Sequence, residues 1–309
     1  MKTLIVLFSR LPFSALHLIS DFGFLLLYFG IGYRKKVVRE NLARSFPEKS
    51  EAERLLIEKQ FFRNFADILI ETIKTFTITE AELRARIEFK TPEVARELWE
   101  KRVNVAGISS HLANWELLAQ SLSLEFNHLC FGVFKPLSSP AMNEAVVVSR
   151  QRFGIRMIPM KAVRRAIRED HGRPYLLGLL SDQAPHDYEK AFEVEFLNQK
   201  TFVVPGPGIL TIQENLTPIW GWMRRTGRSR FEWGVEVLSF DPPAGGFTDE
   251  QRVQILRISK AHKISESDAG RALALILNYS KRLEAQIKMA PQDWLWSHRR
   301  WKSRASSTR

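Results

Sequence analysis

Apolar residues along this chain follow two patterns, which alternate from one end to the other. Short continuous apolar runs are typical of buried strands, and longer stretches with an apolar residue every three or four positions are typical of amphipathic helices. Residues 103–118, VNVAGISSHLANWELL, show the change most clearly: we expect a strand over 103–108, a turn of small residues, then a helix that carries Trp115. Similar apolar runs predict further strands over residues 128–134, 157–160, 175–180, 218–224 and 230–240.

Helical periodicity accounts for most of the remaining chain. A long amphipathic helix is expected over residues 51–76, and a last one over 269–288, which Pro291 ends. Shorter helices are expected over residues 80–87, 92–101, 140–153, 161–169 and 209–214. The alternation of strands and helices, without an internal repeat or a clear second domain, predicts an α/β fold in which helices flank a central mixed sheet.

The first 33 residues are strongly apolar and predict a membrane anchor. Residues 22–33 carry no charge, but a spanning helix needs about 20 apolar residues, and Arg10, His17 and Asp21 interrupt the longer run. The segment therefore either spans the bilayer or lies in its interface, with a buried hairpin of a soluble protein as the alternative. No small-x-small cleavage site follows, which disfavours a cleaved signal peptide. The basic residues at positions 34–44 would hold the following domain on the cytoplasmic side.

Charge and cysteine content limit the class of protein. Among 309 residues, 46 Lys and Arg exceed 34 Asp and Glu, which gives a net charge of +12. This excess indicates an anionic partner, such as nucleic acid, an anionic membrane or an acidic substrate. The one cysteine, Cys130, excludes a disulfide within the chain and a cysteine-based zinc site. The motifs of P-loop enzymes, zinc peptidases and α/β-hydrolases are absent from the sequence.

The basic, tryptophan-rich segment 294–302 allows three interpretations. It could stack on single-stranded nucleic acid, lie at a membrane interface, or cover the core. The apolar N-terminus of the same chain favours the second or the third.

His111 and Glu116 are the first candidates for chemistry. On a continuous helix, five steps of about 100° would place their side chains roughly 140° apart. They can meet if His111 lies in the turn before the helix and Glu116 in its first turn. The carboxylate would then fix the tautomer of the imidazole and stabilise its charged form, which makes a general base for a hydroxyl group. The junction of a buried strand and a helix is where α/β folds place active sites.

Other polar residues are expected near this junction. Lys135 and Asp182 follow predicted strands, so they could line the same cleft as His111. Arg150 and Arg152, at the end of a predicted helix, could bind phosphates or carboxylates in bidentate fashion. The alternatives are a solvated helix face for each arginine and a turn cap for Asp182.

HLANWE, residues 111–116, resembles the His-x4-Asp/Glu box of glycerolipid acyltransferases. Further blocks are similar to the lipid A biosynthesis acyltransferases of the lauroyl/myristoyl group, within the lysophospholipid-acyltransferase-like superfamily. These blocks follow the family's order over almost the whole chain, with Lys135 where many members have arginine. They are RKKVVRENLARSFPEKS at 34–50, FFRNFADILIETIK at 61–74, KPLSSPAMNEAVVVSRQRFG at 135–154, SDQAP at 181–185 and DWLWSHRRWK at 293–302.

The chain is thus expected to comprise the apolar anchor over residues 1–33, an acyltransferase domain over 34–302 and a flexible, serine-rich tail over 303–309. The resemblance implies a membrane-anchored enzyme at the cytoplasmic face of the bacterial inner membrane. The enzyme would move a fatty acyl chain from acyl carrier protein to a hydroxyl group of an acylated lipid A precursor. By this implication His111 is the general base and Glu116 its orienting partner. Arg150 or Arg152 would bind the acceptor phosphate or the oxyanion, and Asp182 would support the site.

The residues alone agree with this chemistry. Thioester alcoholysis needs a base and a donor for the oxyanion, without a covalent intermediate, so we expect no metal and no cofactor. The positive charge suits acyl carrier protein, a phosphorylated lipid and anionic membrane lipids as partners rather than nucleic acid. Two alternatives stay open: an acyltransferase for another membrane acceptor, such as a lysophospholipid or an aminolipid, and a non-catalytic basic protein that binds membranes or nucleic acid.

Overall fold

The structure is a computed structural model that describes residues 2–301. Within these residues, seven strands form one sheet in the order β1-β9-β8-β2-β5-β3-β4, and β6 and β7 form a separate hairpin. The strands are β1 (Ile87–Phe89), β2 (Val105–Ser109), β3 (Leu129–Phe134), β4 (Arg156–Pro159), β5 (Tyr175–Leu180), β6 (Phe192–Phe196), β7 (Gln199–Val203), β8 (Thr217–Gly227) and β9 (Arg230–Val237).

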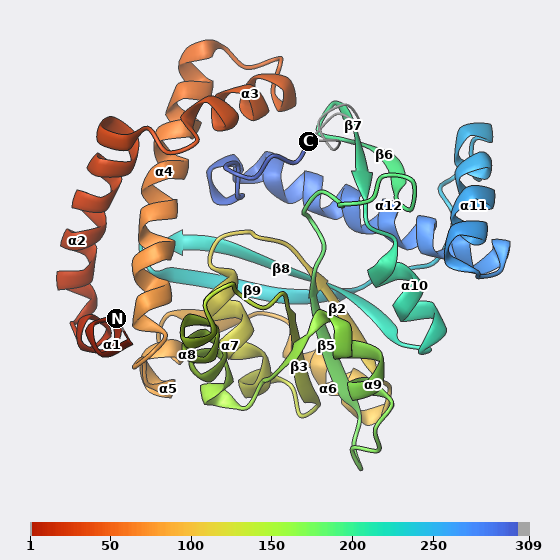
Figure 1. Ribbon diagram of the computed structural model, residues 1–309, viewed down its shortest axis with the longest axis horizontal. Helices are drawn as coiled ribbons and strands as arrows, with labels where there is room; N and C mark the ends of the chain where they lie inside the picture. Colours follow the sequence, from red (N-terminus) through yellow and green to blue (C-terminus); the bar gives the residue numbers. More distant parts are fainter. Residues whose placement is uncertain (1, 302–309) are drawn as a thin grey trace.

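Helices surround the sheet (Figure 1). The α-helices are α1 (Lys2–Ser9), α2 (Phe13–Leu25), α3 (Lys35–Ser45), α4 (Glu51–Lys74), α5 (Glu80–Arg84), α6 (Pro92–Glu100), α7 (Trp115–Glu125), α8 (Pro140–Arg150), α9 (Val163–Ile167), α10 (Gly206–Gln213), α11 (Asp249–His262) and α12 (Glu266–Met289). A π-helical segment, η1 (Leu26–Ile31), continues α2, and short 3-10 turns are η2 (Gln151–Phe153), η3 (Met160–Ala162) and η4 (Pro291–Asp293).

The sheet is mixed, as the sequence predicts. β8, β2, β5, β3 and β4 run parallel to one another, β9 is antiparallel to β8, and β1 runs parallel to β9. β2 and β5 are direct neighbours, with Ser109 opposite Leu180. Because parallel strands end at the same edge of a sheet, the residues that follow β2 and β5 lie side by side.

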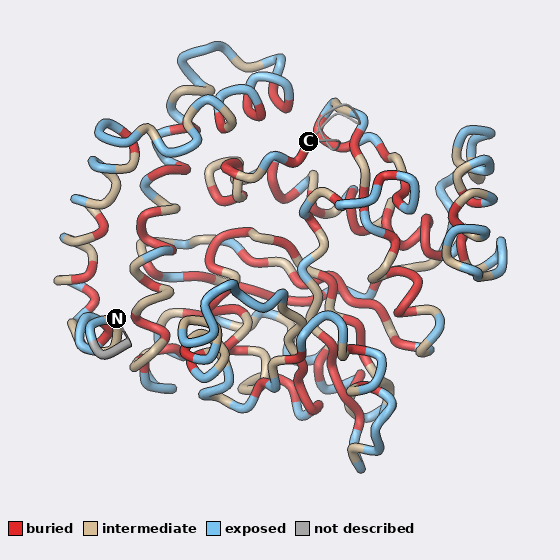
Figure 2. The backbone as a smooth tube through the Cα atoms, viewed as in Figure 1, coloured by how far each residue is buried: buried red, intermediate tan, exposed pale blue. Residues whose placement is uncertain are grey.

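The two faces of the sheet have separate apolar cores. On one face, Leu117 of α7 packs with Val105, Leu176 and Trp233 of the strands. On the other face, α9 and α10 cover β3 and β5, and α12 covers β8. Buried residues concentrate in the inner strands of the sheet (Figure 2), as is expected where helices cover both faces, whereas the edge strands β1 and β4 have one buried residue each.

The N-terminal segment lies along α4 at one end of the molecule (Figure 1). The joined helix α2–η1, Phe13–Ile31, is the one helix of the described chain that is long and apolar enough to cross a membrane. Its partner α4 begins with a capping box in which Ser50 and Glu53 satisfy each other's backbone N–H groups. The apolar helix predicted as an anchor is therefore present.

The sequence analysis did not predict β1, the β6–β7 hairpin or α11. Each of them is stabilised by contacts with a neighbouring element. β1 lies where the sequence suggested the end of a helix, because pairing of Ile87–Phe89 with residues 231–233 of β9 turns this short segment into an edge strand. The β6–β7 hairpin forms by antiparallel pairing of residues 192–196 with 199–203, and α11 covers the outer part of α12. Residues 303–309, predicted as a flexible tail, lie outside the described residues.

The Pro-Gly-Pro-Gly stretch at residues 205–208, which caps and begins α10, yields a test of packing. A Cβ atom added at Gly208 would lie 3.2 Å from the carbonyl oxygen of Ala272 in α12, whereas one added at Gly206 would meet only a Val204 methyl at 3.6 Å. We expect Gly208→Ala to lower the free energy of unfolding by about 1–3 kcal/mol because it forces two helices apart. Gly206→Ala is the matched control and should be neutral or stabilising by up to about 1 kcal/mol. Denaturant unfolding measures both, and equal stability of the two variants would contradict close packing at Gly208.

Candidate active site

The turn between β2 and α7 presents His111 at the edge of the sheet. Ala113 has a positive φ of 47°, an unusual conformation for a residue with a Cβ atom. Its N–H donates to the carbonyl oxygen of Asp293 at 2.8 Å, and Leu112 forms an antiparallel bridge with Trp294. Asn114 then caps α7, because its Oδ1 accepts from the N–H of Leu117 at 3.0 Å. Hydrogen bonds to the C-terminal segment and to the first turn of α7 therefore fix the conformation of this turn.

His111 and Asp182 form a buried pair. The Nδ1 atom of His111 lies 2.7 Å from Oδ1 of Asp182, and the backbone N–H of His111 donates to Oδ2 at 3.0 Å. The indole N–H of Trp294 also donates to Oδ2, at 2.9 Å. An ionised carboxylate only accepts hydrogen bonds, so Nδ1 carries the proton and Nε2 is left as the acceptor. Gln183 Nε2 is 3.4 Å from that acceptor.

Opposing influences set the charge of this pair. Burial disfavours the imidazolium form of His111 and is the largest influence, but the charge and hydrogen bond of Asp182 and the charge of Glu116 together raise its pKa above 6.5. Burial likewise raises the pKa of Asp182, yet the charge and hydrogen bonds of His111 outweigh it and hold the pKa at about 2. Asp182 is thus ionised at neutral pH and stabilises a proton on His111.

Glu116 does not occupy the position that the sequence suggested. Both its carboxylate oxygens bind Arg150, with Nη2 to Oε1 at 2.6 Å and Nε to Oε2 at 2.8 Å. Within the described chain, Asp182 rather than Glu116 is hydrogen-bonded to His111. The expected pairing is corrected for a geometric reason: β5 is hydrogen-bonded to β2, so its end lies beside His111, whereas the first turn of α7 directs Glu116 towards α8.

The other two candidates lie apart from the His111–Asp182 pair. Arg152 is exposed and donates through Nη1 to the carbonyl oxygen of Thr75 at 2.8 Å. Lys135 follows β3 at the predicted edge of the sheet and is exposed, and the structure of residues 2–301 gives it no hydrogen bond or ion pair. Lys135 and Asp182 were expected to line one cleft with His111, but of these three only His111 lines the cavity described below, and Asp182 lies behind it. Glu116 and Arg150 form a second pair.

A largely apolar cavity of about 150 Å³ opens beside these residues. His111, Glu116, Arg150 and Ser109 contribute polar groups to its wall, and the ring of Trp115 lies edge-on to His111 with 5.0 Å between centroids. The remaining lining is mainly aliphatic and aromatic, and comes from α7 and the strands: Leu118, Leu122, Val133, Leu176, Leu179, Ile219, Trp233 and Val235.

A row of glycines makes room for this cavity. Gly107 of β2 is opposite Gly178 of β5, which is opposite Gly132 of β3. Residues in register on adjacent strands project from the same face of a sheet, and all three line the cavity. The sheet therefore lacks side chains along a line perpendicular to its strands, directly under α7.

Reading the sequence missed three parts of the site. Trp294 and Trp296 are buried at 2% and 0% exposure, so the basic, tryptophan-rich segment covers the core, as the third interpretation held, and also supplies a hydrogen bond to Asp182. Gln183 and the glycine row were not identified. The sequence features that could have indicated them are the Asp-Gln dipeptide after a predicted strand, for Gln183, and a glycine in the middle of each of three apolar runs, for the glycine row.

No group of three His, Cys, Asp or Glu side chains is placed to hold a metal ion within residues 2–301. Cys130 is buried, and burial raises the pKa of its thiol to about 11, so it is not a thiolate at neutral pH.

Comparison with known proteins gives the same family as the motifs. A family model described as bacterial lipid A biosynthesis acyltransferase matches residues 3–303. The lipid A biosynthesis lauroyltransferase of Escherichia coli (strain K12) is 24% identical over 275 residues, which cover 88% of this chain and 80% of that protein. A lipid A biosynthesis acyltransferase of Haemophilus influenzae is 24% identical over 306 residues, 95% of this chain and 86% of that protein.

The residues matched by the family model include the turn of His111, the end of β5 and the C-terminal segment, which together build the site. Since the family model spans nearly the full length, the chain belongs to the bacterial lipid A biosynthesis acyltransferase family.

Proposed function

We propose that this acyltransferase moves a fatty acyl chain from the thioester of acyl carrier protein to a hydroxyl group of an acylated lipid A precursor. The observation that carries the proposal is a histidine whose Nδ1 is held by buried Asp182 and which lines an apolar cavity. The cavity suits a hydrocarbon chain, and the histidine suits removal of a proton from an alcohol.

The proposed reaction is a direct transfer. Nε2 of His111 takes the proton of the acceptor hydroxyl as its oxygen attacks the thioester carbon. The tetrahedral intermediate then collapses with cleavage of the carbon–sulfur bond, and the leaving thiolate takes the proton from the imidazolium. Asp182 stabilises the imidazolium between these steps and keeps the ring in the productive tautomer.

Arg150 is the proposed electrophilic partner. Its Nε and Nη2 atoms are bound to Glu116, which fixes the guanidinium at the cavity wall. The hydrogen bonds between described residues leave Nη1 as a donor for the thioester oxyanion or an acceptor phosphate. Glu116 is thus proposed to position Arg150, and its negative charge also favours protonated His111. Lys135 is a second proposed contact for an acceptor phosphate, and the Arg152 contact with Thr75 makes Arg152 the weaker candidate.

The row of Gly107, Gly178 and Gly132 supports the acyl part of the proposal. An extended alkyl chain needs a narrow apolar channel without polar groups, and a sheet surface without side chains forms one wall of such a channel. We place the acyl chain of the donor between this row and α7, with its thioester near His111.

The proposed location is the cytoplasmic face of the bacterial inner membrane. The net charge of +12 favours an acidic carrier protein, a phosphorylated acceptor and anionic lipids together. The family name supports a lipid A-type acceptor over a lysophospholipid or aminolipid. A binding protein without catalysis would not require the His111–Asp182 geometry.

The direct test is an acyl-transfer assay. Purified protein in detergent is incubated with acyl carrier proteins that carry different chains and with a tetra-acylated lipid A precursor, and mass spectrometry reads the products. We expect one added acyl mass with the wild type, and a rate lower by about 10²–10⁴-fold with His111→Ala, because the general base is lost. Equal rates would exclude His111 as the base, and product with another lipid acceptor only would replace lipid A as the substrate.

The pH dependence tests the role of Asp182. Activity requires neutral His111, so the wild-type rate should fall as the pH drops through the raised pKa of His111. Asp182→Asn removes the charge that raises this pKa and leaves burial to lower it. We therefore expect the acid limb of kcat/KM to move to lower pH while the maximum falls by about 10²–10⁴-fold. Thermal unfolding controls for folding, and an acid limb that stays in place would show that Asp182 does not set the pKa.

Chain-length preference tests the position of the acyl chain. A Cβ atom at Gly107 would meet Leu176 at 3.4 Å, an ordinary contact, so Gly107→Ala should fold and place a methyl group in the cavity. We expect the ratio of kcat/KM for the longest accepted chain to that for a shorter one to fall by about 10–200-fold, the effect of about one methylene in an apolar pocket. Gly206→Ala, outside the cavity, is the control, and an unchanged ratio with Gly107→Ala would place the acyl chain elsewhere.

A further inference from the structure

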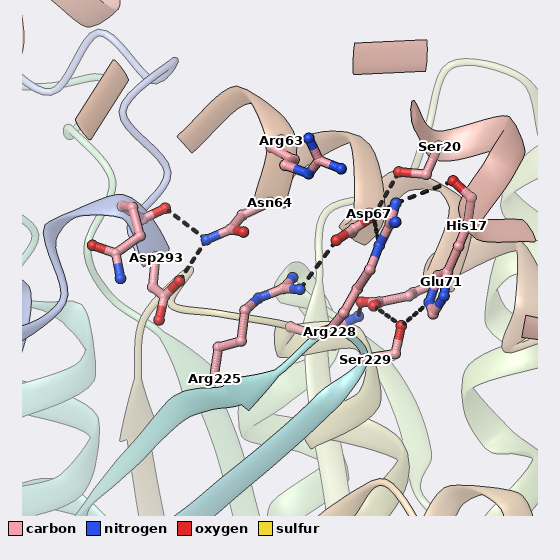
Figure 3. A network of polar contacts seen from close by, with 12 residues as sticks. His17, Ser20, Arg63, Asn64, Asp67, Glu71, Arg225, Arg228, Ser229 and Asp293 are labelled. Carbon is pink, nitrogen blue, oxygen red and sulfur yellow. Dashed lines mark hydrogen bonds and ion pairs between the residues drawn. The ribbon is translucent and has the colours of Figure 1, made fainter. Parts of the chain in front are cut away.

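The polar side of α2 faces the rest of the protein (Figure 3). Ser20 is buried, and its Oγ donates to Oδ1 of Asp67 in α4 at 2.7 Å. Asp21 binds Arg228, which lies between β8 and β9, with Nη2 to Oδ1 at 2.8 Å, and the same Nη2 lies 2.9 Å from Asp67. Asp21, the acidic residue that interrupts the apolar N-terminal run, is therefore part of an ion-pair network that joins α2 to α4 and to the β8–β9 turn.

A second chain of contacts joins α2 to the same place. Nε2 of His17 lies 2.7 Å from Oγ of Ser229, which also donates to the carboxylate of Glu71. Glu71 is fully enclosed and accepts a hydrogen bond from Asn114, the residue that caps α7. Polar contacts thus extend from α2, through α4 and the β8–β9 turn, to the helix that carries Glu116.

The opposite side of the joined helix α2–η1 is exposed and apolar. Its members recur at spacings of four and three, so they form one stripe along the helix. The adjacent helix α1 exposes apolar residues as well. The stripe consists of Leu18 at 72% exposure, Phe22 at 67%, Leu25 at 51% and Phe29 at 66%, and α1 adds Leu4, Leu7 and Phe8.

These contacts are incompatible with a spanning helix in this packing. Asp21 and Phe22 lie at the middle of the segment Phe13–Ile31, so a spanning orientation would put Asp21, Arg228 and Asp67 at the centre of the bilayer. The same orientation would also place α4 and the irregular turn between β8 and β9 in the bilayer. Helix α4 runs alongside α2 (Figure 1) and exposes Lys59 and Arg63. Exposed charges and lipid-exposed turns are excluded from the hydrocarbon region by their desolvation cost.

We infer that α2–η1 lies parallel to the membrane surface, with the stripe Leu18–Phe29 inserted into one leaflet of an anionic bilayer and both ends of the segment on the same side. The partner is a lipid surface because the stripe is flanked by exposed cations: Arg10 before it, and Arg34 and Lys36 after it. Such flanks match anionic headgroups. The inference rests on the proposed membrane location of the enzyme and is independent of the acyl-transfer reaction.

Single-cysteine labelling separates the two orientations. In a Cys130→Ser background, Arg10→Cys and Lys36→Cys mark the two ends, and a membrane-impermeant maleimide is applied to spheroplasts and to inside-out membrane vesicles. We expect both positions to react only in inside-out vesicles, because both ends lie on the cytoplasmic side. Reaction of Arg10→Cys in spheroplasts together with Lys36→Cys in inside-out vesicles would show a spanning helix and overturn the inference.

Depth is measured on the purified protein. A spin label at Phe22→Cys is compared with one at Val253→Cys on α11, a site of 64% exposure on another part of the molecule. With vesicles of phosphatidylcholine and phosphatidylglycerol, we expect the Phe22 label at a depth of about 5–10 Å and the Val253 label in water. A Phe22 label at the bilayer centre, or one that stays in water, would contradict insertion in the plane of the interface.

Removal of the stripe isolates binding from catalysis. Phe22→Ser combined with Phe29→Ser should weaken binding to these vesicles by about a hundredfold or more, because two phenylalanine side chains lose their burial. Acyl transfer in detergent should stay near the wild-type rate, since neither residue lines the cavity. Unchanged vesicle binding would refute the role of the stripe, whereas absence of transfer in the wild type would refute the proposed function alone.

Discussion

The site depends on one buried carboxylate, that of Asp182. It accepts hydrogen bonds from the backbone and the imidazole of His111 and from the indole of Trp294, and so connects the turn after β2, the end of β5 and the C-terminal segment. An unpaired charge in this position would be strongly destabilising: removal of one partner of a buried pair costs about 3–5 kcal/mol. The requirement to satisfy Asp182 therefore holds three distant segments in one arrangement, and that arrangement leaves Nε2 of His111 as an acceptor.

The cavity beside this buried carboxylate is, by contrast, largely apolar. Glycines at matching positions of β2, β5 and β3 remove side chains from the sheet surface, and α7 covers the gap with leucines. His111 therefore contacts the buried carboxylate of Asp182 on one side and lines an apolar cavity on the other. Such a boundary suits a substrate with a polar reacting group at one end of a hydrocarbon chain.

The polar residues within the apolar N-terminal segment are explained by their partners in the folded domain. His17, Ser20 and Asp21 interrupt a run that otherwise reads as a membrane anchor, and each of them meets a partner in α4 or in the β8–β9 turn. Each of these side chains is paired within the folded domain, so none of them has to enter the hydrocarbon region without a partner. The remaining side of the helix is left for lipid, which reconciles the apolar composition of the segment with its charges.

Much of this protein follows from its sequence. Period-two and period-3.6 patterns are local, so β5, α7 and α12 could be placed within a few residues, and the order of the motifs indicated the family. The choice of Asp182 over Glu116 as the partner of His111 could not be read in this way, because it depends on β5 lying next to β2 in the sheet, about 70 residues away along the chain. Likewise, the glycine row, the contact of Trp294 and the partners of Asp21 exist only once strands and helices are brought into register. Local patterns determined most of the helices and strands, whereas long-range packing decided which side chains meet and also defined β1, whose strand conformation depends on its pairing with β9.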